Sequence, residues 1–272
     1  MRGGMDKITS LQNPKVKGAV KLRERREREK TQTFLIEGYR ELLRAVEGQA
    51  KLETLFYSPS HFLGSNENNL IERILSLNVE VIEVSKEVFE KLSYRDRPDG
   101  LLAIALQQHL SLEELSLGEV PFILVAEAIE KPGNLGSILR SCDAVGVDAL
   151  LLCDRTTDVH NPNVVRSSVG TLFTVPIVET TSEAALMWLN EQKIPIISSS
   201  PNAPNIYTEV DQTGPVALAV GTEQLGLSET WIDAASKLVK IPMLGHADSL
   251  NVAAATTLLL YEVIRQRTHL SR

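Results

Sequence analysis

The stretch VPFILVAEAIEKPGNLGSILRSCDAVG, residues 120–146, decides the fold class of this chain. Its first seven residues, 120–126, form a continuous apolar run, which is typical of a strand covered on both faces of a sheet. The sequence Lys-Pro-Gly at 131–133 breaks that strand. Asn134 is a favourable N-cap, and apolar residues at helical spacing continue to Gly146, a favourable helix stop. The stretch therefore predicts a strand, a turn and a helix.

Arg140 lies within this predicted helix, about a turn and a half beyond the cap. A strand-to-helix turn with exposed backbone amides and a nearby cation is how open α/β sheets hold anions at the carboxyl edge of their strands. We therefore expect a ligand site at this turn. The turn by itself does not assign a function.

The same alternation of strands and helices runs through the rest of the chain. We expect strands at 33–37, 52–57, 79–84, 101–106, 120–126, 149–153, 174–178, 195–199, 216–220 and 238–241, and helices at 15–29, 38–47, 69–77, 85–92, 134–146, 162–169, 182–192, 228–235 and 250–266. Residues 107–119 have weak periodicity and several acids, which indicates a linker. The prediction is an α/β fold with two domains, residues 1–106 and 120–272.

Charge is unevenly distributed along the chain. The whole sequence has a net charge of -7, yet residues 1–44 hold 12 Lys or Arg against 6 Asp or Glu. Such a basic segment indicates an RNA-facing surface, with Lys15, Lys17, Lys21, Arg23, Arg25 and Arg28 as candidate RNA-binding residues. The other interpretation is a solvated helix, because residues 21–30 mix both signs at spacings that favour pairs within a helix. Composition does not separate the two interpretations.

The sequence also argues against several classes of protein. No apolar run approaches the roughly 18 residues of a membrane helix, and the N-terminus has no signal-peptide core, so we expect a cytoplasmic protein without a membrane partner. Cys142 and Cys153 fall in predicted buried elements, where small apolar fillers are the expected role. We therefore expect neither a disulfide framework nor a metal site.

Three loops that follow predicted strands carry glycines and polar residues. The turn 133–136 spaces its glycines as G-x-x-G, so it lacks the G-x-G-x-x-G pattern of dinucleotide-binding turns. The loops 221–228, GTEQLGLS, and 241–251, IPMLGHADSLN, each have a structural interpretation in which Ser228 or Ser249 caps the following helix. Singly, none of the three loops specifies a site.

Together, the three loops resemble a known family. The patterns N-x-G-x-x-x-R from Asn134, G-T-E-x-x-G-L-S from Gly221 and I-P-M-x-G-x-x-x-S-L-N-V from Ile241 resemble the SpoU-type, TrmH-like RNA 2′-O-ribose methyltransferases of the SPOUT superfamily, over residues 120–272. The patterns S-x-x-N-P-x-V-K at 10–17 and F-L-I-E-G at 34–38 resemble the family's RNA-binding domain.

The resemblance implies both a fold and an activity. The expected fold is a C-terminal SPOUT domain with a deep trefoil knot, plus a small N-terminal α/β domain similar to a ribosomal-protein-like RNA-binding fold. The expected activity is transfer of a methyl group from S-adenosylmethionine to a ribose 2′-hydroxyl of RNA by a homodimer, with ribosomal RNA as the expected substrate and rRNA processing as the expected role. The alternatives are a transfer RNA 2′-O-methyltransferase or a binding-only ribosome-associated protein of the same fold. The intact motif set favours the enzyme.

The resemblance also assigns site residues by motif match. It implies cofactor contacts at Gly221, Ile241, Met243, Ser249, Leu250 and Ser199, and catalytic roles for Asn134, Arg140, Glu223, Ser249 and Asn251. A guanidinium is a poor base, so we expect Arg140 to hold an RNA phosphate and stabilise a developing alkoxide. We expect Asn134 and Asn251 to position the ribose and Arg140, and Glu223 to orient one of these side chains.

Overall fold

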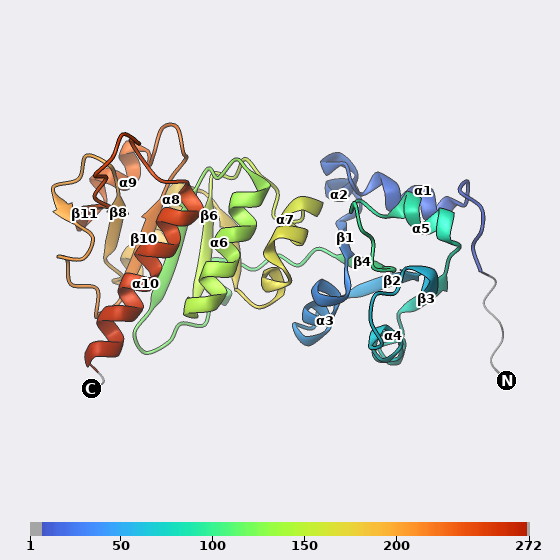
Figure 1. The fold of residues 1–272 in the computed structure, drawn as a ribbon. Helices are drawn as coiled ribbons and strands as arrows, with labels where there is room; N and C mark the ends of the chain where they lie inside the picture. Colours follow the sequence, from blue (N-terminus) through green and yellow to red (C-terminus); the bar gives the residue numbers. More distant parts are fainter. Residues whose placement is uncertain (1–6, 271–272) are drawn as a thin grey trace. The chain divides into compact units, whose positions relative to one another are not determined.

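The computed structural model describes residues 7–270, which divide into two compact units (Figure 1). The first unit contains the described residues up to Gln108 together with Asp158–Thr174, and the second contains His109–Thr157 and the described residues from Val175 onward. The segment 158–174 therefore packs within the first unit, although the sequence places it between two strands of the second.

The first unit is built on a four-stranded sheet in the order β1-β4-β2-β3. Strand β4 is antiparallel to β1 and β2, and β2 is parallel to β3. Helices α1 and α5 cover one face of this sheet, and α3 and α4 cover the other (Figure 1). The strands are β1 (Thr33–Glu37), β2 (Leu52–Tyr57), β3 (Glu80–Glu83) and β4 (Leu101–Leu106), and the helices are α1 (Pro14–Lys21), α2 (Arg25–Thr31), α3 (Tyr39–Glu47), α4 (Glu67–Ser76) and α5 (Lys86–Leu92).

Strand β1 shows how this core is formed. Successive side chains of a strand point to opposite faces, so Leu35 packs with α1 and α5 while Phe34 and Ile36 pack with α3 and α4. Helix α7 (Pro162–Ser168) contributes Val165 to the second of these clusters, and the 3-10 helix η3 (Thr171–Phe173) packs beside it. The segment 158–174 is thus part of the hydrophobic core of the first unit.

The basic helix expected at 15–29 is two helices, because the chain turns between α1 and α2. The side chain of Arg28 spans the break: its Nη1 donates to the carbonyl groups of Leu22 and Arg23 at 2.9 and 2.8 Å. Its Nε and Nη2 donate to Asp158 Oδ2 at 2.9 and 2.7 Å. Arg28 is 1% exposed. It is therefore unavailable to an RNA phosphate, and we remove it from the predicted RNA-binding set.

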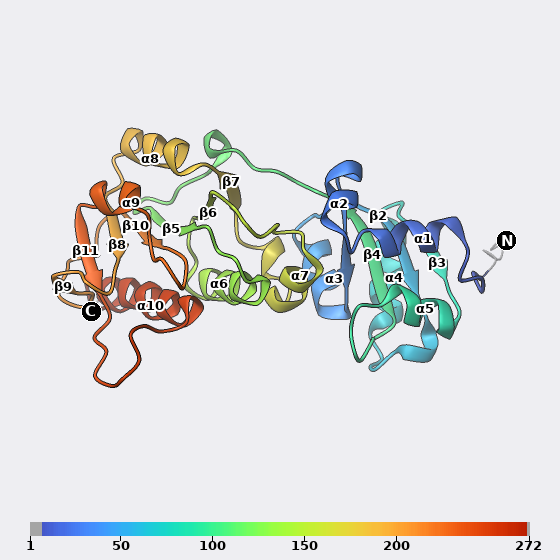
Figure 2. The same ribbon diagram turned by 90° about the horizontal axis from the view of Figure 1, so that it is seen from above.

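The second unit is built on a seven-stranded parallel sheet in the order β7-β6-β5-β10-β8-β11-β9. Helices α6 and α10 lie on one face and α8 and α9 on the other (Figure 2). The predicted α/β class is therefore confirmed. The strands are β5 (Phe122–Glu127), β6 (Ala149–Cys153), β7 (Ile177–Thr180), β8 (Ile196–Ser199), β9 (Asn205–Ile206), β10 (Val216–Val220) and β11 (Lys237–Lys240), and the helices are α6 (Pro132–Val145), α8 (Ser182–Glu191), α9 (Glu229–Asp233) and α10 (Val252–Leu270).

Several local expectations hold and others need correction. Gly146 ends α6 in a left-handed conformation with φ 67°, and both cysteines are buried, as predicted. Strand β7 begins at Ile177 rather than at 174, and β9 was not expected from the polar stretch that contains it. The expected linker 107–119 contains a short 3-10 helix, η2 (Leu112–Glu114), and its leucines at 110, 112, 115 and 117 pack on the α8 side of the sheet.

Two predicted helix caps are wrong. Asn134 is the third residue of α6, and Lys131 occupies the N-cap position. Ser249 does not begin α10, because the side chain of Asn251 accepts the Ala253 N–H at 3.0 Å and takes the capping role.

Within residues 7–270, no helix is long and apolar enough to cross a membrane, and no cluster of three or more His, Cys, Asp or Glu side chains could hold a metal ion.

Candidate active site

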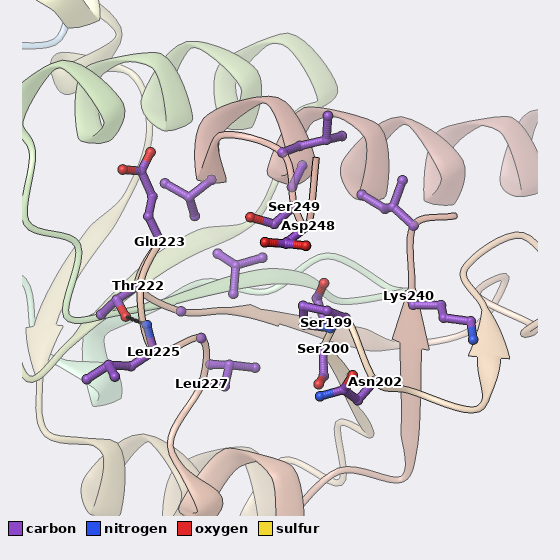
Figure 3. A pocket seen from close by; sticks show the side chains of 18 of the residues that line it. Ser199, Ser200, Asn202, Thr222, Glu223, Leu225, Leu227, Lys240, Asp248 and Ser249 are labelled. Carbon is purple, nitrogen blue, oxygen red and sulfur yellow. Dashed lines mark hydrogen bonds between the residues drawn. The ribbon is translucent and has the colours of Figure 1, made fainter. Parts of the chain in front are cut away.

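Three loops of the second unit meet around one cavity at the carboxyl edge of the parallel sheet. Because all of these strands run in the same direction, the loops after β8, β10 and β11 leave the sheet at the same edge. The cavity has a volume of about 970 Å³, within the range of small-molecule sites. Its lining comes mainly from residues 199–202, 220–227, 240–243 and 248–250 (Figure 3).

The structure brings all six predicted cofactor-contacting residues to this cavity. Gly221, Ile241, Met243, Ser249, Leu250 and Ser199 all line it. Figure 3 shows Asp248 and Ser249 on one side of the cavity, with Ser199 and Ser200 opposite them. These six residues span 51 positions of the sequence, from Ser199 to Leu250, so their common location comes from the sheet topology.

The loop 221–228 forms one wall of the cavity and is internally bonded. Thr222 and Gly226 exchange two backbone hydrogen bonds at 3.1 and 3.0 Å, and the Thr222 hydroxyl accepts the Leu225 N–H at 3.0 Å. At Gly221 an added Cβ would lie 2.3 Å from the Gly226 carbonyl oxygen, so only glycine allows this close approach. The loop is therefore a compact, internally bonded unit.

Side chains from all three motifs converge beside this loop. Glu223 Oε1 accepts hydrogen bonds from Asn134 Nδ2 at 3.0 Å and from Asn251 Nδ2 at 2.6 Å. Asn251 Nδ2 also lies 3.0 Å from Asn134 Oδ1. The second carboxylate oxygen, Oε2, accepts from Lys131 Nζ at 2.5 Å. We call these four residues, Lys131, Asn134, Glu223 and Asn251, the Glu223 cluster.

Electrostatics favours a charged carboxylate at the centre of the Glu223 cluster. The hydrogen bond from Lys131, followed by that from Asn134, holds the pKa of Glu223 below its usual value. The same hydrogen bond from the other side raises the pKa of Lys131. A charged acceptor at this point fixes the orientation of two amide side chains. Both Nδ2 protons of Asn251 are used within the cluster, whereas one Nδ2 proton of Asn134 and a lone pair on each amide oxygen are available to a ligand.

Two further predicted catalytic residues, Arg140 and Ser249, have no hydrogen bond to the Glu223 cluster within residues 7–270. Arg140 lies on α6 six residues beyond Asn134, which corresponds to about 9 Å along the helix axis. Its side chain is exposed, and among residues 7–270 it has no hydrogen-bond or ion-pair partner. Ser249 lines the cavity and is exposed. Arg140 is therefore free to meet a ligand.

Sequence reasoning missed Lys131, Asp248 and Lys240. In the sequence Lys131 is only part of a strand-breaking turn, whereas in the structure it begins α6 as the N-cap residue and its ammonium pairs with Glu223. Asp248 and Lys240 line the cavity with opposite charges. Their signal was position, since each lies within a few residues of a predicted cofactor-contacting residue.

The remaining candidate RNA-binding residues of the first unit are exposed. Lys17 and Lys21 lie on the open side of α1, and Lys15 forms an ion pair with Glu80. Arg25 pairs with Glu29 at 2.8 Å. Arg23 Nη2 contacts the backbone carbonyl oxygens of residues 91–93 at 2.6 to 3.0 Å, so this side chain helps to hold the end of α5.

Comparison with family models gives two matches along the chain. The model of the SpoU rRNA Methylase family matches residues 121–261. The model of the MRM3-like substrate binding domain matches residues 13–103. The first match spans the sheet and loops that form the cavity, and the second falls in the first unit.

Individual relatives match nearly the whole chain. The 23S rRNA (guanosine(2553)-2'-O)-methyltransferase RlmP of Bacillus subtilis is 29% identical over 95% of this chain and 99% of its own length. The 23S rRNA (uridine(2479)-2'-O)-methyltransferase of Streptomyces viridochromogenes is 31% identical over 89% of this chain and 86% of its own. The crystal structure of an AdoMet-bound rRNA methyltransferase from Sinorhizobium meliloti has a TM-score of 0.88 and 30% identity, covering 96% of this chain and 97% of that one.

Proposed function

This chain belongs to the SpoU rRNA methylase family, and we propose that it methylates a ribose 2′-hydroxyl of ribosomal RNA with S-adenosylmethionine as methyl donor. It is an RNA 2′-O-methyltransferase. The observation that carries the proposal is the meeting of Asn134, Glu223 and Asn251, one residue from each of three sequence motifs, beside a cavity that fits a nucleoside.

The residues around the cavity fit S-adenosylmethionine. An adenosine needs backbone donors and acceptors together with apolar walls, and Gly221, Ile241 and Leu250 offer both. Lys240 and Asp248 add one charge of each sign, which suits the carboxylate and the amine of a methionine moiety. When bound, S-adenosylmethionine supplies an electrophilic methyl group on a sulfonium.

The side chains of the chain itself then have to align a ribose hydroxyl and remove its proton. We propose that Asn134 and Asn251, fixed by Glu223, hydrogen-bond to the ribose and hold its hydroxyl in line for displacement. Arg140 holds the RNA phosphate and stabilises the developing alkoxide. Because a guanidinium keeps its proton, an RNA phosphate oxygen or water accepts the proton. Lys131 keeps Glu223 charged through their ion pair.

We further propose a trefoil knot, a homodimer and a cytoplasmic location. The knot is supported by the path of the chain, because β10 enters the sheet between β5 and β8, β11 lies beyond β8, and α10 returns to pack on α6. The homodimer is supported by α10, whose Leu258 and Tyr261 are 41% and 50% exposed. The cytoplasmic location follows from a ribosomal RNA substrate. A crystal structure traced through residues 216–270 tests the knot.

Two measurements test the proposed function. Calorimetry with S-adenosylmethionine should show binding, and mapping of ribose methylation in total RNA from cells with and without the gene should reveal a site in ribosomal RNA that is lost without it. An Asn134→Ala variant, which removes a Glu223 partner, should bind the cofactor and fail to restore the site. Cofactor binding without any gene-dependent methylation would indicate a binding-only protein. A gene-dependent site in transfer RNA would show that transfer RNA, and not ribosomal RNA, is the substrate.

A further inference from the structure

Glu127, the last residue of β5, carries a buried carboxylate that the proposed mechanism does not use. Its exposed fraction is 7%. Oε2 accepts the backbone N–H of Ser228 at 2.8 Å, and Oε1 accepts the Ser228 hydroxyl at 2.6 Å. The hydroxyl of Ser182 lies 3.4 Å from Oε1. A carboxylate buried in this way is stable only because such donors replace its lost hydration.

The neighbouring contacts show that Ser228 is the main partner of Glu127. A serine hydroxyl has a single proton. Ser182 Oγ donates its proton to Asp154 Oδ2 at 2.5 Å and accepts the indole N–H of Trp231 at 2.8 Å. The longer contact from Ser182 to Glu127 is therefore secondary. The main hydrogen-bond partner of Glu127 is therefore Ser228, the last residue of the loop 221–228, which we call the cavity loop.

Both ends of the cavity loop are consequently fixed to the sheet. Its first residue, Gly221, directly follows β10, and β10 pairs with β5 so that Val220 lies opposite Ala126. Glu127 therefore emerges beside Gly221, on the adjacent strand, and holds the other end of the loop through Ser228. Between these ends the loop carries Glu223 to its contacts with Asn134 and Asn251.

We propose that Glu127 is a positioning residue, which sets the place of the loop 221–227 through Ser228 and thereby shapes the cofactor cavity and places Glu223. The identity of the cofactor rests on the proposed function, whereas the anchoring of the loop does not. Without the carboxylate, the N–H and hydroxyl of Ser228 would lose their buried acceptor, and the end of the loop would shift toward water. Cofactor binding would then have to order the loop again, which lowers affinity.

The variants Glu127→Gln and Ser228→Ala test this role, with Ser236→Ala as the matched control. Ser236 donates its hydroxyl to the Ile196 carbonyl oxygen at 2.7 Å in the same unit and does not line the cavity. We expect the backbone amides at positions 222 and 228 to exchange about 10-fold faster in both test variants than in wild type, after correction for the intrinsic exchange rate of the residue present. The dissociation constant for S-adenosylmethionine, per folded molecule, should rise by about 5-fold to 10-fold. The Ser236→Ala variant should change neither quantity.

Each result decides a separate claim. Unchanged exchange of the loop amides in both test variants would overturn the anchoring. Faster exchange with an unchanged dissociation constant would overturn the link from Glu127 to the cavity. If wild-type protein binds no S-adenosylmethionine, the proposed function fails, and faster exchange in the variants still supports the anchoring. Should Glu127→Gln not fold, Ser228→Ala, which retains the backbone hydrogen bond, carries the test.

Discussion

Replacing Arg28 with methionine should strongly destabilise the first unit, because the change leaves a buried carboxylate without its partner. The Arg28 and Asp158 side chains are 1% and 6% exposed. Arg28 makes two hydrogen bonds to Asp158 and two to backbone carbonyl groups, all between 2.7 and 2.9 Å. Breaking a buried ion pair on one side costs about 3–5 kcal/mol, so Arg28→Met should lower the free energy of unfolding by about that amount at neutral pH.

The destabilisation caused by Arg28→Met should become smaller as the pH falls. Burial by itself raises the pKa of Asp158, but the hydrogen bonds from Arg28 and from the His160 N–H, with the charges of both residues, hold it below its usual value. A depressed pKa stabilises the folded state fully above the unfolded value of about 4 and loses that contribution as pH falls through the folded value. The difference between wild type and Arg28→Met should therefore narrow below about pH 4.

Urea unfolding followed by circular dichroism measures the free energy of unfolding and, when repeated across the pH range, its dependence on pH. The control is Arg25→Met, because Arg25 forms an exposed pair with Glu29 and should change stability by less than about 1 kcal/mol. A double variant, Arg28→Met with Asp158→Leu, should be less destabilised than the sum of the two single changes, since no charge remains buried. The reasoning fails if Arg28→Met lowers the free energy of unfolding no more than the control does at neutral pH, or if Arg28→Met lowers it as much at acid pH as at neutral pH.

Three further outcomes are expected. Arg140→Ala should reduce the rate of single-turnover methylation by about 100-fold or more, while cofactor affinity and thermal stability change little. Arg140→Lys should restore little of that rate because lysine lacks the planar guanidinium, and near-normal turnover by the alanine variant would remove Arg140 from the mechanism. Changing Lys21 and Arg25 to Glu should weaken RNA affinity and reduce the dependence of log affinity on log salt concentration by about one unit for each lost phosphate contact. Lys193→Glu in the second unit should change neither quantity, and equal effects of the two changes would show that the basic helices are a solvated face without a role in RNA binding. Light scattering at micromolar concentration should give a dimer mass, and a fully active monomer would contradict the homodimer.

Local patterns in the sequence account for most of the secondary structure. The apolar run before Glu127 predicts a doubly covered strand, and β5 is buried along its whole length. Asn13 before Pro14 predicts a helix start, and the Asn13 side chain accepts the Lys15 N–H at 2.9 Å. These features depend on residues a few positions apart, so hydrophobic period and capping chemistry are enough to predict them.

The sequence by itself determined the α/β class, most of the strand and helix positions, and the residues that could form a site. Only the tertiary structure decided how those residues are used. Asn134 had the sequence context of a helix cap, yet its side chain bonds to Glu223, 89 positions away. Arg28 had the context of a surface cation, yet it is buried against Asp158, 130 positions away. Local pattern cannot predict such partners, because a polar side chain bonds to whichever group packing brings within reach, and the packing depends on the whole chain.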